Sequence, residues 1–528
     1  MRLPRSLPVF FRLLLITIFL KQIMWMAFIP MWQFPDEQAH FAQVQNRAEA
    51  GGIIYPPFDT SMEIILTEEA LGTYRDGFGN NKYTYHPEFN IEYSNSRAGL
   101  VEESLRNLPL SVRTEYIKKE ATLNPPLYYS IGSYFYKAVN SESIFERVFA
   151  LRLFSVILFM LLILTAYKTS QILFKKNNYL QYSLTALVAF MPMLVFSSTG
   201  ILPDPLTNLL FSLTILISLL IIEKGIKFKY LFFAILIIIA GSLTRQQFLI
   251  ALPIFISAII FSFFIKRSLK QLALLSFFIL IIIMLGFTLP SLWYIKQISL
   301  PEVGQIDLKL FFANDFLNYL KTFALETYNR TFAWYWGVYR WLSLTLPPII
   351  YLIIKSIVLL GFIGIIIKII KDIAKGNIKK DIYFYFLITA SLIYIAIIVI
   401  WDYYFRLGHG FSFGIQGRYL FPLIIAHLSL LIIGLKTVLE TVYGKYADIG
   451  IYLVVLLMMV FNLYTLFFVS GSYYDTSSIG NLINQASQYK AQFVKGNIII
   501  FLISANISAQ LLFAYSLAKN AFKKNFQN

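Results

Sequence analysis

The feature that most constrains this fold is a series of apolar runs, each about twenty residues long. The first extends from Val9 to Pro30, and similar runs recur to the end of the chain. About 20 apolar residues in a helix cross a bilayer. Inside lipid every backbone polar group must be paired within the segment, which favours helices. The sequence therefore predicts an all-α polytopic membrane protein.

Composition supports this prediction and narrows the function classes. Of the 528 residues, 58% are hydrophobic, and the mean hydropathy is +0.65. The formal net charge is +17, but the basic residues fall in short loops between apolar runs, as the positive-inside rule expects, so we do not expect nucleic acid as a partner. Cysteine is absent, which excludes disulfides and thiolate metal sites.

The apolar runs and their flanking charges predict roughly twelve spans. They cover residues 9–30, 150–173, 179–198, 205–222, 230–243, 247–264, 272–294, 344–370, 382–401, 419–435, 449–470 and 497–518. The short loops on one side carry Lys or Arg, which predicts that both termini are cytoplasmic. We expect a multi-pass protein of a cell membrane, most simply a bacterial plasma membrane.

The remaining residues predict how the chain is organised outside the bilayer. We expect a single membrane domain over 1–528, a first external loop over 31–147 that carries interfacial helices, and a second external loop over 295–341. Polar loops of this length usually have a function. Within the first loop, 37–50 reads as a short helix that ends at Gly51-Gly52.

The stretch from Trp32 to His40 directly follows the first span. Pro35 suits the first turn of a helix, and the carboxylates of Asp36 and Glu37 suit its positive N-terminal end. His40 lies one turn further on, facing both carboxylates. An ordinary interfacial helix start explains the same residues, so this stretch alone leaves two interpretations open.

Other charged residues are predicted to share the external face with Asp36. Asp204 opens a span after Pro203, where it is either a common first-turn residue or a second carboxylate of the site. Arg245 interrupts an apolar hairpin, where it either reaches the interface or has a function. Gln416 and Arg418 lie in a glycine-rich stretch, which suits close approach of a phosphate but also an ordinary loop.

Five short motifs follow one another along the chain. They are Pro35-Asp36-Glu37-x-x-His40, Asn124-Pro125-Pro126-Leu127-Tyr128-Tyr129, Arg152-Leu153-x-Ser155, Pro203-Asp204 and Gln416-Gly417-Arg418-Tyr419-Leu420. Together they resemble the GT-C superfamily of integral-membrane glycosyltransferases, most of all a bacterial branch of multi-span proteins. The aminoarabinose and protein mannosyl transferases are similar at a greater distance. The resemblance covers the whole chain in motif order and topology.

This resemblance implies an inverting glycosyltransferase at the external membrane face. The donor would be a sugar carried on a polyprenyl phosphate, and the acceptor a glycan, lipid or protein of the cell envelope. Asp36 matches the superfamily's carboxylate in the first external loop, so it is expected to be the general base, with Glu37 as a second catalytic residue. His40 is expected to orient the carboxylate of Asp36.

The remaining site residues follow from the same resemblance and from the chemistry of the donor. Asp204 is expected to serve the acceptor or to act as a second carboxylate. Arg245, Gln416 and Arg418 are expected to bind the donor phosphate, because cations stabilise a leaving phosphate. We expect no metal ligands and no cofactor, although two carboxylates at one site leave a divalent cation at Asp36 and Asp204 as an alternative.

The chain also departs from the superfamily's pattern. Leu202 stands where relatives often have Asn, Arg245 where many have Lys, and Asn124 where many have His or Lys, which weakens the case for a phosphate role at Asn124. The alternative function is a transporter or flippase of lipid-linked sugars. It would use the same basic groove without needing Asp36 as a base.

Overall fold

The computed structural model describes residues 8–51, 58–74, 93, 95–119, 125–265 and 316–526, most of which are helical. Nine helical segments in this part of the chain are long and apolar enough to cross a membrane. They are Val9–Phe28, Ile144–Leu173, Asp204–Lys224, Gln246–Ile265, Pro348–Ala374, Ile382–His409, Gly417–Tyr443, Ala447–Tyr474 and Asn497–Phe522. The prediction of a helical, polytopic membrane protein is confirmed.

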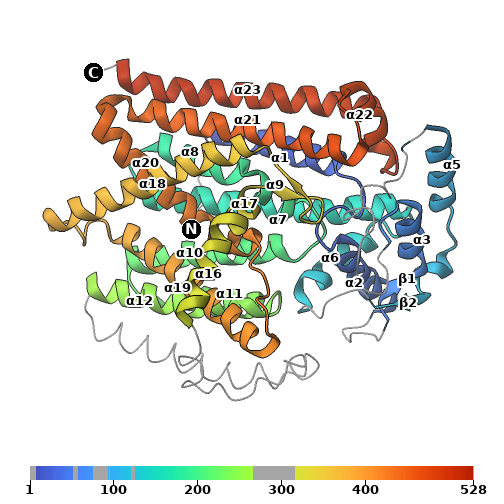
Figure 1. The fold of residues 1–528 in the computed structure, drawn as a ribbon, viewed down its shortest axis with the longest axis horizontal. Helices are drawn as coiled ribbons and strands as arrows, with labels where there is room; N and C mark the ends of the chain where they lie inside the picture. Colours follow the sequence, from blue (N-terminus) through green and yellow to red (C-terminus); the bar gives the residue numbers. More distant parts are fainter. Residues whose placement is uncertain are drawn as a thin grey trace.

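The apolar helices lie side by side in one bundle (Figure 1). They are α1 (Val9–Phe28), α7 (Ile144–Leu173), α8 (Asn178–Phe190), α9 (Pro192–Ser197), α10 (Asp204–Lys224), α11 (Phe228–Ser242), α12 (Ala251–Ile265), α18 (Pro348–Ala374), α19 (Ile382–His409), α20 (Ile424–Tyr443), α21 (Ala447–Tyr474) and α23 (Asn497–Phe526). Among the candidate spans α10 is the most buried, at 89% of its apolar stretch, whereas the value for α18 is 17%. The core therefore lies around α10, and α18 lies at the periphery.

The structure also accounts for two of the shorter predicted spans. The span predicted over 230–243 is α11, an apolar helix of Phe228–Ser242, and the one predicted over 179–198 is divided into α8 and α9. The span predicted over 272–294 lies outside the described residues.

Pro192 causes the break between α8 and α9. Proline has no N–H, so carbonyls in the last turn of α8 lose their helical donors. Lys21 of α1 donates to the carbonyl of Ala189, and the Asn462 side chain of α21 donates to that of Phe190 over 3.1 Å. Lys21, near the middle of the first span, therefore has a buried structural role.

Helices α18 and α20 pack backbone to backbone. A Cβ built on Gly364 would lie 1.9 Å from the carbonyl oxygen of Gly434, and one built on Gly434 would lie 2.0 Å from that of Gly361. No larger residue fits at these positions without separating the helices. Small residues permit such close approach between membrane helices.

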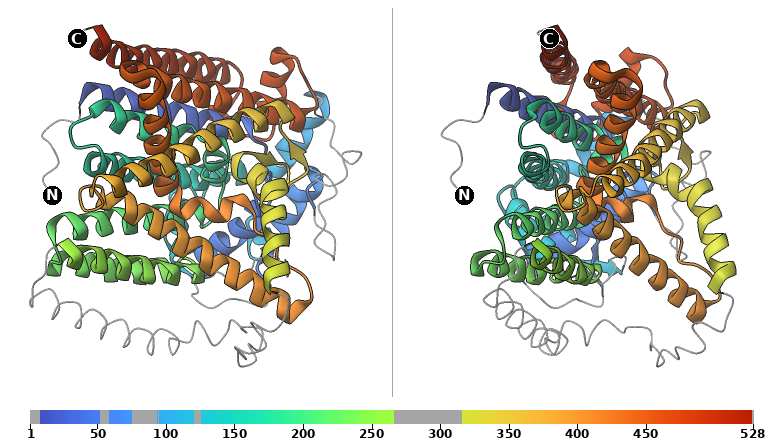
Figure 2. Two further views of the ribbon diagram at one scale, coloured as in Figure 1. Left: turned by 60° about the vertical axis from the view of Figure 1, so that its left-hand side comes forward. Right: turned by 90° about the vertical axis from the view of Figure 1, so that its left-hand side faces the viewer.

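The starts and ends of the helices show which parts of the chain lie at each end of the bundle. Helix α1 begins, and α7, α10, α18, α20 and α23 end, at one end of the bundle (Figure 2). The other end carries the shorter elements: α2 (Glu37–Ala50), β1 (Thr60–Ser61), α3 (Met62–Ala70), α5 (Asn95–Arg106), η2 (Leu110–Arg113), β2 (Tyr116–Lys118) and α6 (Leu127–Lys137). Helix α2 has the bounds predicted for it, and Gly51 follows it in a left-handed conformation with φ 68°.

A buried ion pair fixes these shorter elements to the bundle. Arg147 of α7 donates to the carboxylate of Glu63 in α3 over 2.9 Å and to the hydroxyl of Tyr136 in α6 over 2.6 Å. Strands β1 and β2 pair antiparallel, with Thr60 opposite Lys118 and Ser61 opposite Tyr116. Gln45 of α2 donates to the same Glu63 carboxylate over 2.6 Å, so this network also holds α2, which begins directly after Asp36.

The remaining short elements lie between the long helices in the sequence. They are η3 (Gln246–Ile250), α16 (Phe316–Glu326), η4 (Thr327–Thr331), α17 (Phe332–Trp336), β3 (Val338–Tyr339), β4 (Leu344–Thr345), η5 (Gly417–Leu423), η6 (Gly444–Tyr446), α22 (Ile479–Ala486) and η7 (Gln492–Val494). Strands β3 and β4 form an antiparallel hairpin, with Val338 opposite Thr345. The fold is thus mostly helical, and the described residues add two small two-stranded sheets to the all-α prediction.

Candidate functional site

The site is built around the turn that joins α1 to α2. Trp32 and Asp36 adopt left-handed conformations there, with φ 64° and φ 53°. Each costs about 1–3 kcal/mol for a residue other than glycine, so surrounding contacts must hold the turn. The turn places Asp36 at the N-cap of α2, where the positive end of the helix favours a carboxylate. The Asp36 side chain remains 40% exposed.

The contacts that hold this turn converge on Glu37. Arg152 of α7 binds its carboxylate with both arms of the guanidinium, over 2.8 Å and 2.7 Å. The same carboxylate accepts the backbone N–H of Trp32 over 3.0 Å. Glu37 is fully buried. Glu37 was expected to be catalytic beside Asp36. Both of its carboxylate oxygens accept the hydrogen bonds described above, and these bonds suit Glu37 to a role in positioning the turn that carries Asp36.

Arg152 also satisfies the end of α1. Its guanidinium donates to three backbone carbonyls in that region, those of Met26, Ile29 and Pro30. Carbonyls at a helix C-terminus lack partners within the helix, and here a charged donor from α7 supplies them. The Arg152–Glu37 pair therefore fixes both ends of the segment that presents Asp36.

Arg418 approaches Asp36 from the far end of the sequence. Its Nη2 lies 3.5 Å from Oδ2 of Asp36, and its side chain is 10% exposed. Arg418 belongs to η5, which leads into α20. The two charges predicted to share one face are thus brought into one site.

Gly417 makes this position of Arg418 sterically feasible. A Cβ built on Gly417 would lie 2.0 Å from the backbone nitrogen of Tyr335 in α17. The segment Trp334-Tyr335-Trp336 therefore packs its backbone directly on η5. Gly417 therefore allows the backbone of α17 to pack closely on η5. The sequence had instead suggested that this glycine-rich stretch allows a phosphate to approach closely.

Asp204 and Arg245 form a second ion pair. Oδ1 of Asp204, in the first turn of α10, lies 2.5 Å from Nη2 of Arg245, which precedes η3 at the tip of the α11–α12 hairpin. Arg418 interacts electrostatically with both Asp204 and Asp36. Two carboxylates and two arginines therefore alternate around one site.

His40 lies inside this group of charges. Its Nδ1 is 2.9 Å from the hydroxyl of Tyr129 in α6, and 5% of the residue is exposed. Burial lowers the pKa of His40 from 6.5 to about 4, so the imidazole is neutral at physiological pH. His40 was expected to orient the carboxylate of Asp36. The structure pairs its ring with Tyr129, and the charge of Asp36 acts on the imidazole.

Beside Asp36 lies a cavity of about 190 Å³. It is lined by Gln33, Pro35, Asp36, Met193, Phe196, Val338, Tyr339, Trp341, Leu342, Gln416 and Arg418. Within the part of the chain that the structure describes, Oε1 of Gln33 and the hydroxyl of Tyr339 are buried and have no hydrogen-bond partner. Unpaired buried polar atoms are costly, and here two of them belong to residues that line the same cavity as Asp36 and Arg418.

The hairpin that closes one side of this cavity is strained. Arg340, Trp341 and Leu342, between β3 and β4, have φ angles of 48°, 54° and 71°. Arg340 anchors the turn by donating to Oγ of Ser472 in α21 over 2.8 Å. Strained backbone that is firmly held often occurs at functional sites.

A family model covers most of this arrangement. Residues 19–426 match the family described as predicted membrane protein, DUF2142. The chain belongs to this DUF2142 family. The matched region contains every site residue from Asp36 to Arg418.

No curated protein matches the chain. A solved structure that is similar is the archaeal oligosaccharyltransferase AglB from Archaeoglobus fulgidus, in complex with an inhibitory peptide and a dolichol-phosphate. The identity is 12% and the TM-score 0.42, over 88% of this chain and 56% of AglB. The chain thus spans little more than half of AglB, and a match at this score decides nothing about activity.

The donor set of the DUF2142 site does not favour a divalent cation. Asp204 and Asp36 each lie within ion-pair distance of an arginine. Among the described residues there is no group of three or more His, Cys, Asp or Glu side chains that could hold a metal.

Sequence reasoning missed several residues of this site. Arg152 was quoted as part of a motif without a partner, and Gln33 and Tyr339 were not singled out. An arginine within an apolar span was the available signal for Arg152. Nothing in the sequence pattern marks Gln33 or Tyr339, because their importance depends on the cavity that the folded chain encloses.

Proposed function

We propose that this protein is a glycosyltransferase that moves a sugar from a polyprenyl-phosphate donor to a cell-envelope acceptor. The observation that carries the proposal is the cavity shared by the half-exposed carboxylate of Asp36 and the guanidinium of Arg418. A base and a cation in one cavity are what transfer of a phosphate-linked sugar requires. The predicted external face is the expected place of reaction.

The donor phosphate would bind to Arg418 and Arg245, with Gln416 beside them. The 3.5 Å between Arg418 and Asp36 is longer than the usual 2.7–2.9 Å of a charge-assisted hydrogen bond. This loose pair leaves guanidinium donors for a phosphate. Nε of both arginines is buried and lacks an acceptor in the described part of the chain, which supports the same role.

In the reaction, an acceptor hydroxyl oxygen attacks the anomeric carbon of the donor sugar. The new carbon–oxygen bond forms as the bond from that carbon to the phosphate oxygen breaks, with inversion at the carbon. Asp36 takes the proton of the hydroxyl, and polyprenyl phosphate leaves with its charge stabilised by Arg418 and Arg245. Asp204 holds Arg245 in place through the 2.5 Å ion pair.

The acceptor would lie in the cavity beside Asp36. Gln33 offers an amide oxygen and Tyr339 a hydroxyl, both suited to hydroxyl groups. The Trp341 side chain adds an aromatic surface of the kind on which sugar rings pack. At about 190 Å³ the cavity is smaller than the pockets of roughly 300–1,000 Å³ that hold drug-sized ligands, which suits one sugar-sized unit.

The test is the Asp36→Asn variant, which keeps the shape of the side chain and removes its charge. Sugar transfer by the purified protein is measured with a panel of radiolabelled polyprenyl-phosphate sugars, and donor affinity is measured beside it. We expect the rate to fall about 10²- to 10⁴-fold while donor binding is retained, because the base contacts the acceptor.

Glu326→Gln is the matched control, because Glu326 is an exposed carboxylate that lies apart from the cavity. It should transfer sugar like the unmodified protein. Retained transfer in Asp36→Asn would overturn the assignment of the base. Movement of lipid-linked sugar across vesicles without transfer would support the flippase alternative.

A further inference from the structure

A second and larger cavity lies at the opposite end of the bundle. Its volume is about 610 Å³. Helix α10 connects the two sites, because Asp204 opens the helix and Glu223, near its end, lines this cavity. Nineteen residues at 1.5 Å each separate them by roughly 29 Å, which is close to the thickness of the hydrocarbon core. The cavity is thus far from the proposed chemistry, at the end predicted to be cytoplasmic.

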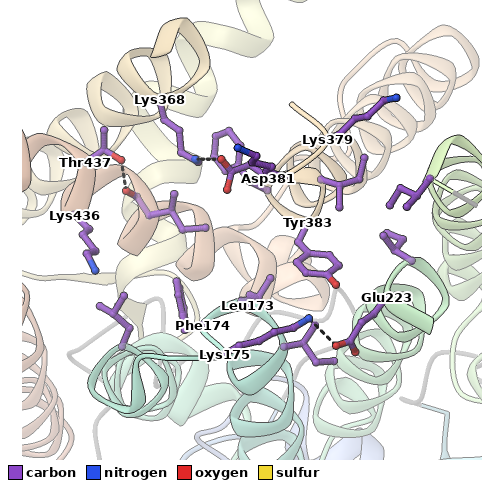
Figure 3. A pocket seen from close by; sticks show the side chains of 18 of the residues that line it. Leu173, Phe174, Lys175, Glu223, Lys368, Lys379, Asp381, Tyr383, Lys436 and Thr437 are labelled. Atoms are coloured by element: carbon purple, nitrogen blue, oxygen red, sulfur yellow. Dashed lines mark hydrogen bonds and ion pairs between the residues drawn. The ribbon is translucent and has the colours of Figure 1, made fainter. Parts of the chain in front are cut away.

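Lysines dominate the charged lining of this cavity. Five lysines line it, against three acidic residues: Lys175, Lys368, Lys379, Lys380 and Lys436, and Glu223, Asp381 and Glu440. Figure 3 shows Lys368 directed at Asp381 and Lys175 at Glu223. Lys436 pairs with Glu440 over 3.4 Å. These pairs leave two lysines in excess.

The two excess lysines are Lys379 and Lys380. Both are exposed, and neither has an ion-pair partner among the residues that the structure describes. They directly precede α19, which begins at Ile382. A cation before a helix N-terminus gains nothing from the helix dipole, so these two charges are not explained as caps.

Most of the rest of the lining is apolar. Ile172, Leu173, Ile222 and Ile265, at the ends of α7, α10 and α12, and Ile433 of α20 face the same space as the lysines. A free anion would use only the charged part of such a lining. A phospholipid uses both parts, because its phosphate meets the lysines and its acyl chains meet the isoleucines.

We propose that this cavity binds the phosphate headgroup of an anionic phospholipid from the leaflet on the lysine-rich side. Lys379 and Lys380 are the residues that contact the phosphate. Lys175 contributes when its exposed pair with Glu223 loosens, since such pairs are weak. This binding is independent of the proposed transfer reaction.

The experiment measures lipid binding to the purified full-length protein in mixed micelles. Phosphatidylglycerol is titrated, with phosphatidylcholine as the neutral lipid and inorganic phosphate as a competitor. We expect phosphatidylglycerol to bind at least about 10-fold more tightly than phosphatidylcholine. The Lys379→Gln/Lys380→Gln variant should lose about 10- to 30-fold in affinity for phosphatidylglycerol. Lys379→Gln alone should lose part of this affinity.

Lys224→Gln/Lys227→Gln is the matched control, because it removes the same charge from two exposed lysines at the same end that do not line the cavity. Its affinity should equal that of the unmodified protein. Equal losses in both double variants, or no loss in either, would overturn the proposal. Displacement of the lipid by inorganic phosphate alone would assign the cavity to a small anion and overturn the lipid assignment.

Discussion

The guanidinium of Arg418 lies 3.5 Å from the carboxylate of Asp36, although 382 residues separate the two in the sequence. Asp36 depends on the turn after α1, and Arg418 on the turn before α20. Their meeting therefore requires α1, α7, α10 and α20 to be packed together. The site is a property of the completed bundle and of no single segment.

Replacing Arg418 tests the donor phosphate site. Arg418→Ala should weaken donor binding by roughly 10- to 100-fold, because a hydrogen bond to a charged group contributes about 1.5–3 kcal/mol. Arg418→Lys should restore only part of the affinity, since a point charge does not reproduce the guanidinium fork. Binding of a radiolabelled donor lipid measures both. Arg330→Ala is the control, because Arg330 is 66% exposed and pairs only with its neighbour Glu326 among the described residues. Unchanged binding in both Arg418 variants would contradict the assignment.

Replacing Glu37 separates positioning from catalysis. Glu37→Gln leaves Arg152 buried and without its charge partner, which should lower the free energy of unfolding by about 3–5 kcal/mol. Asp36→Asn should lower it by less than about 1 kcal/mol, because its pair is longer and partly exposed. Unfolding of the purified variants in one detergent gives the comparison. A Glu37→Gln protein as stable as the unmodified one, yet inactive, would return the catalytic role to Glu37.

His40 predicts how stability depends on pH. Burial lowers its pKa from 6.5 to about 4 in the folded protein. Between these values the unfolded chain binds more protons, so stability falls as the pH falls from about 6.5 to 4. The full effect is about 3 kcal/mol. Unfolding measured from pH 7 to pH 4 should show this slope, and it should be reduced in His40→Gln. The exposed His409 is the control, and His409→Gln should keep the slope. An unchanged slope in His40→Gln would refute the lowered pKa.

Gly417 predicts a steric effect on the site. Gly417→Ala would bring a Cβ within 2.0 Å of the Tyr335 nitrogen, so α17 and η5 must separate. We expect a loss of about 1–3 kcal/mol in stability, as for overpacked cores, together with weaker donor binding. Gly408→Ala is the matched control from the same stretch, because a Cβ there meets nothing within 4 Å. If both variants bind donor equally well, Gly417 does not position Arg418.

The length of the apolar runs in the sequence made most of the helices of the bundle predictable. A segment that must pair all its backbone groups in lipid has few alternatives to a helix, so runs such as 382–401 identify α19 directly. It was also predictable that four charged residues share one face of the protein, namely Asp36, Asp204, Arg245 and Arg418. The basic residues in the short loops indicate which helix ends lie on the same side of the membrane. The end of α2 at Gly51 followed from its preference for a left-handed conformation.

The pairing within the site was not predictable from one sequence. Nothing in the residue pattern says that Glu37 pairs with Arg152 while Asp36 faces Arg418. The two carboxylates are neighbours in the sequence, and only the conformation of the strained turn decides the direction of each side chain. Likewise, the space around Gly417 is filled by Tyr335, which is 82 residues away. Such contacts depend on the packing of distant segments, which periodicity does not report.

The glycine contact between α18 and α20 has a consequence for evolution of this site. The hairpin with Trp341 leads into α18, and η5 with Arg418 leads into α20. Two parts of the cavity lining therefore lead into helices whose relative position is set by the contact of Gly364 with Gly434, roughly 25 Å along α18 from Pro348. A slip of one residue there would move one wall by about 1.5 Å against the other. Substrate selectivity would thus change through substitutions far along the helices from the cavity, at positions that no substrate touches.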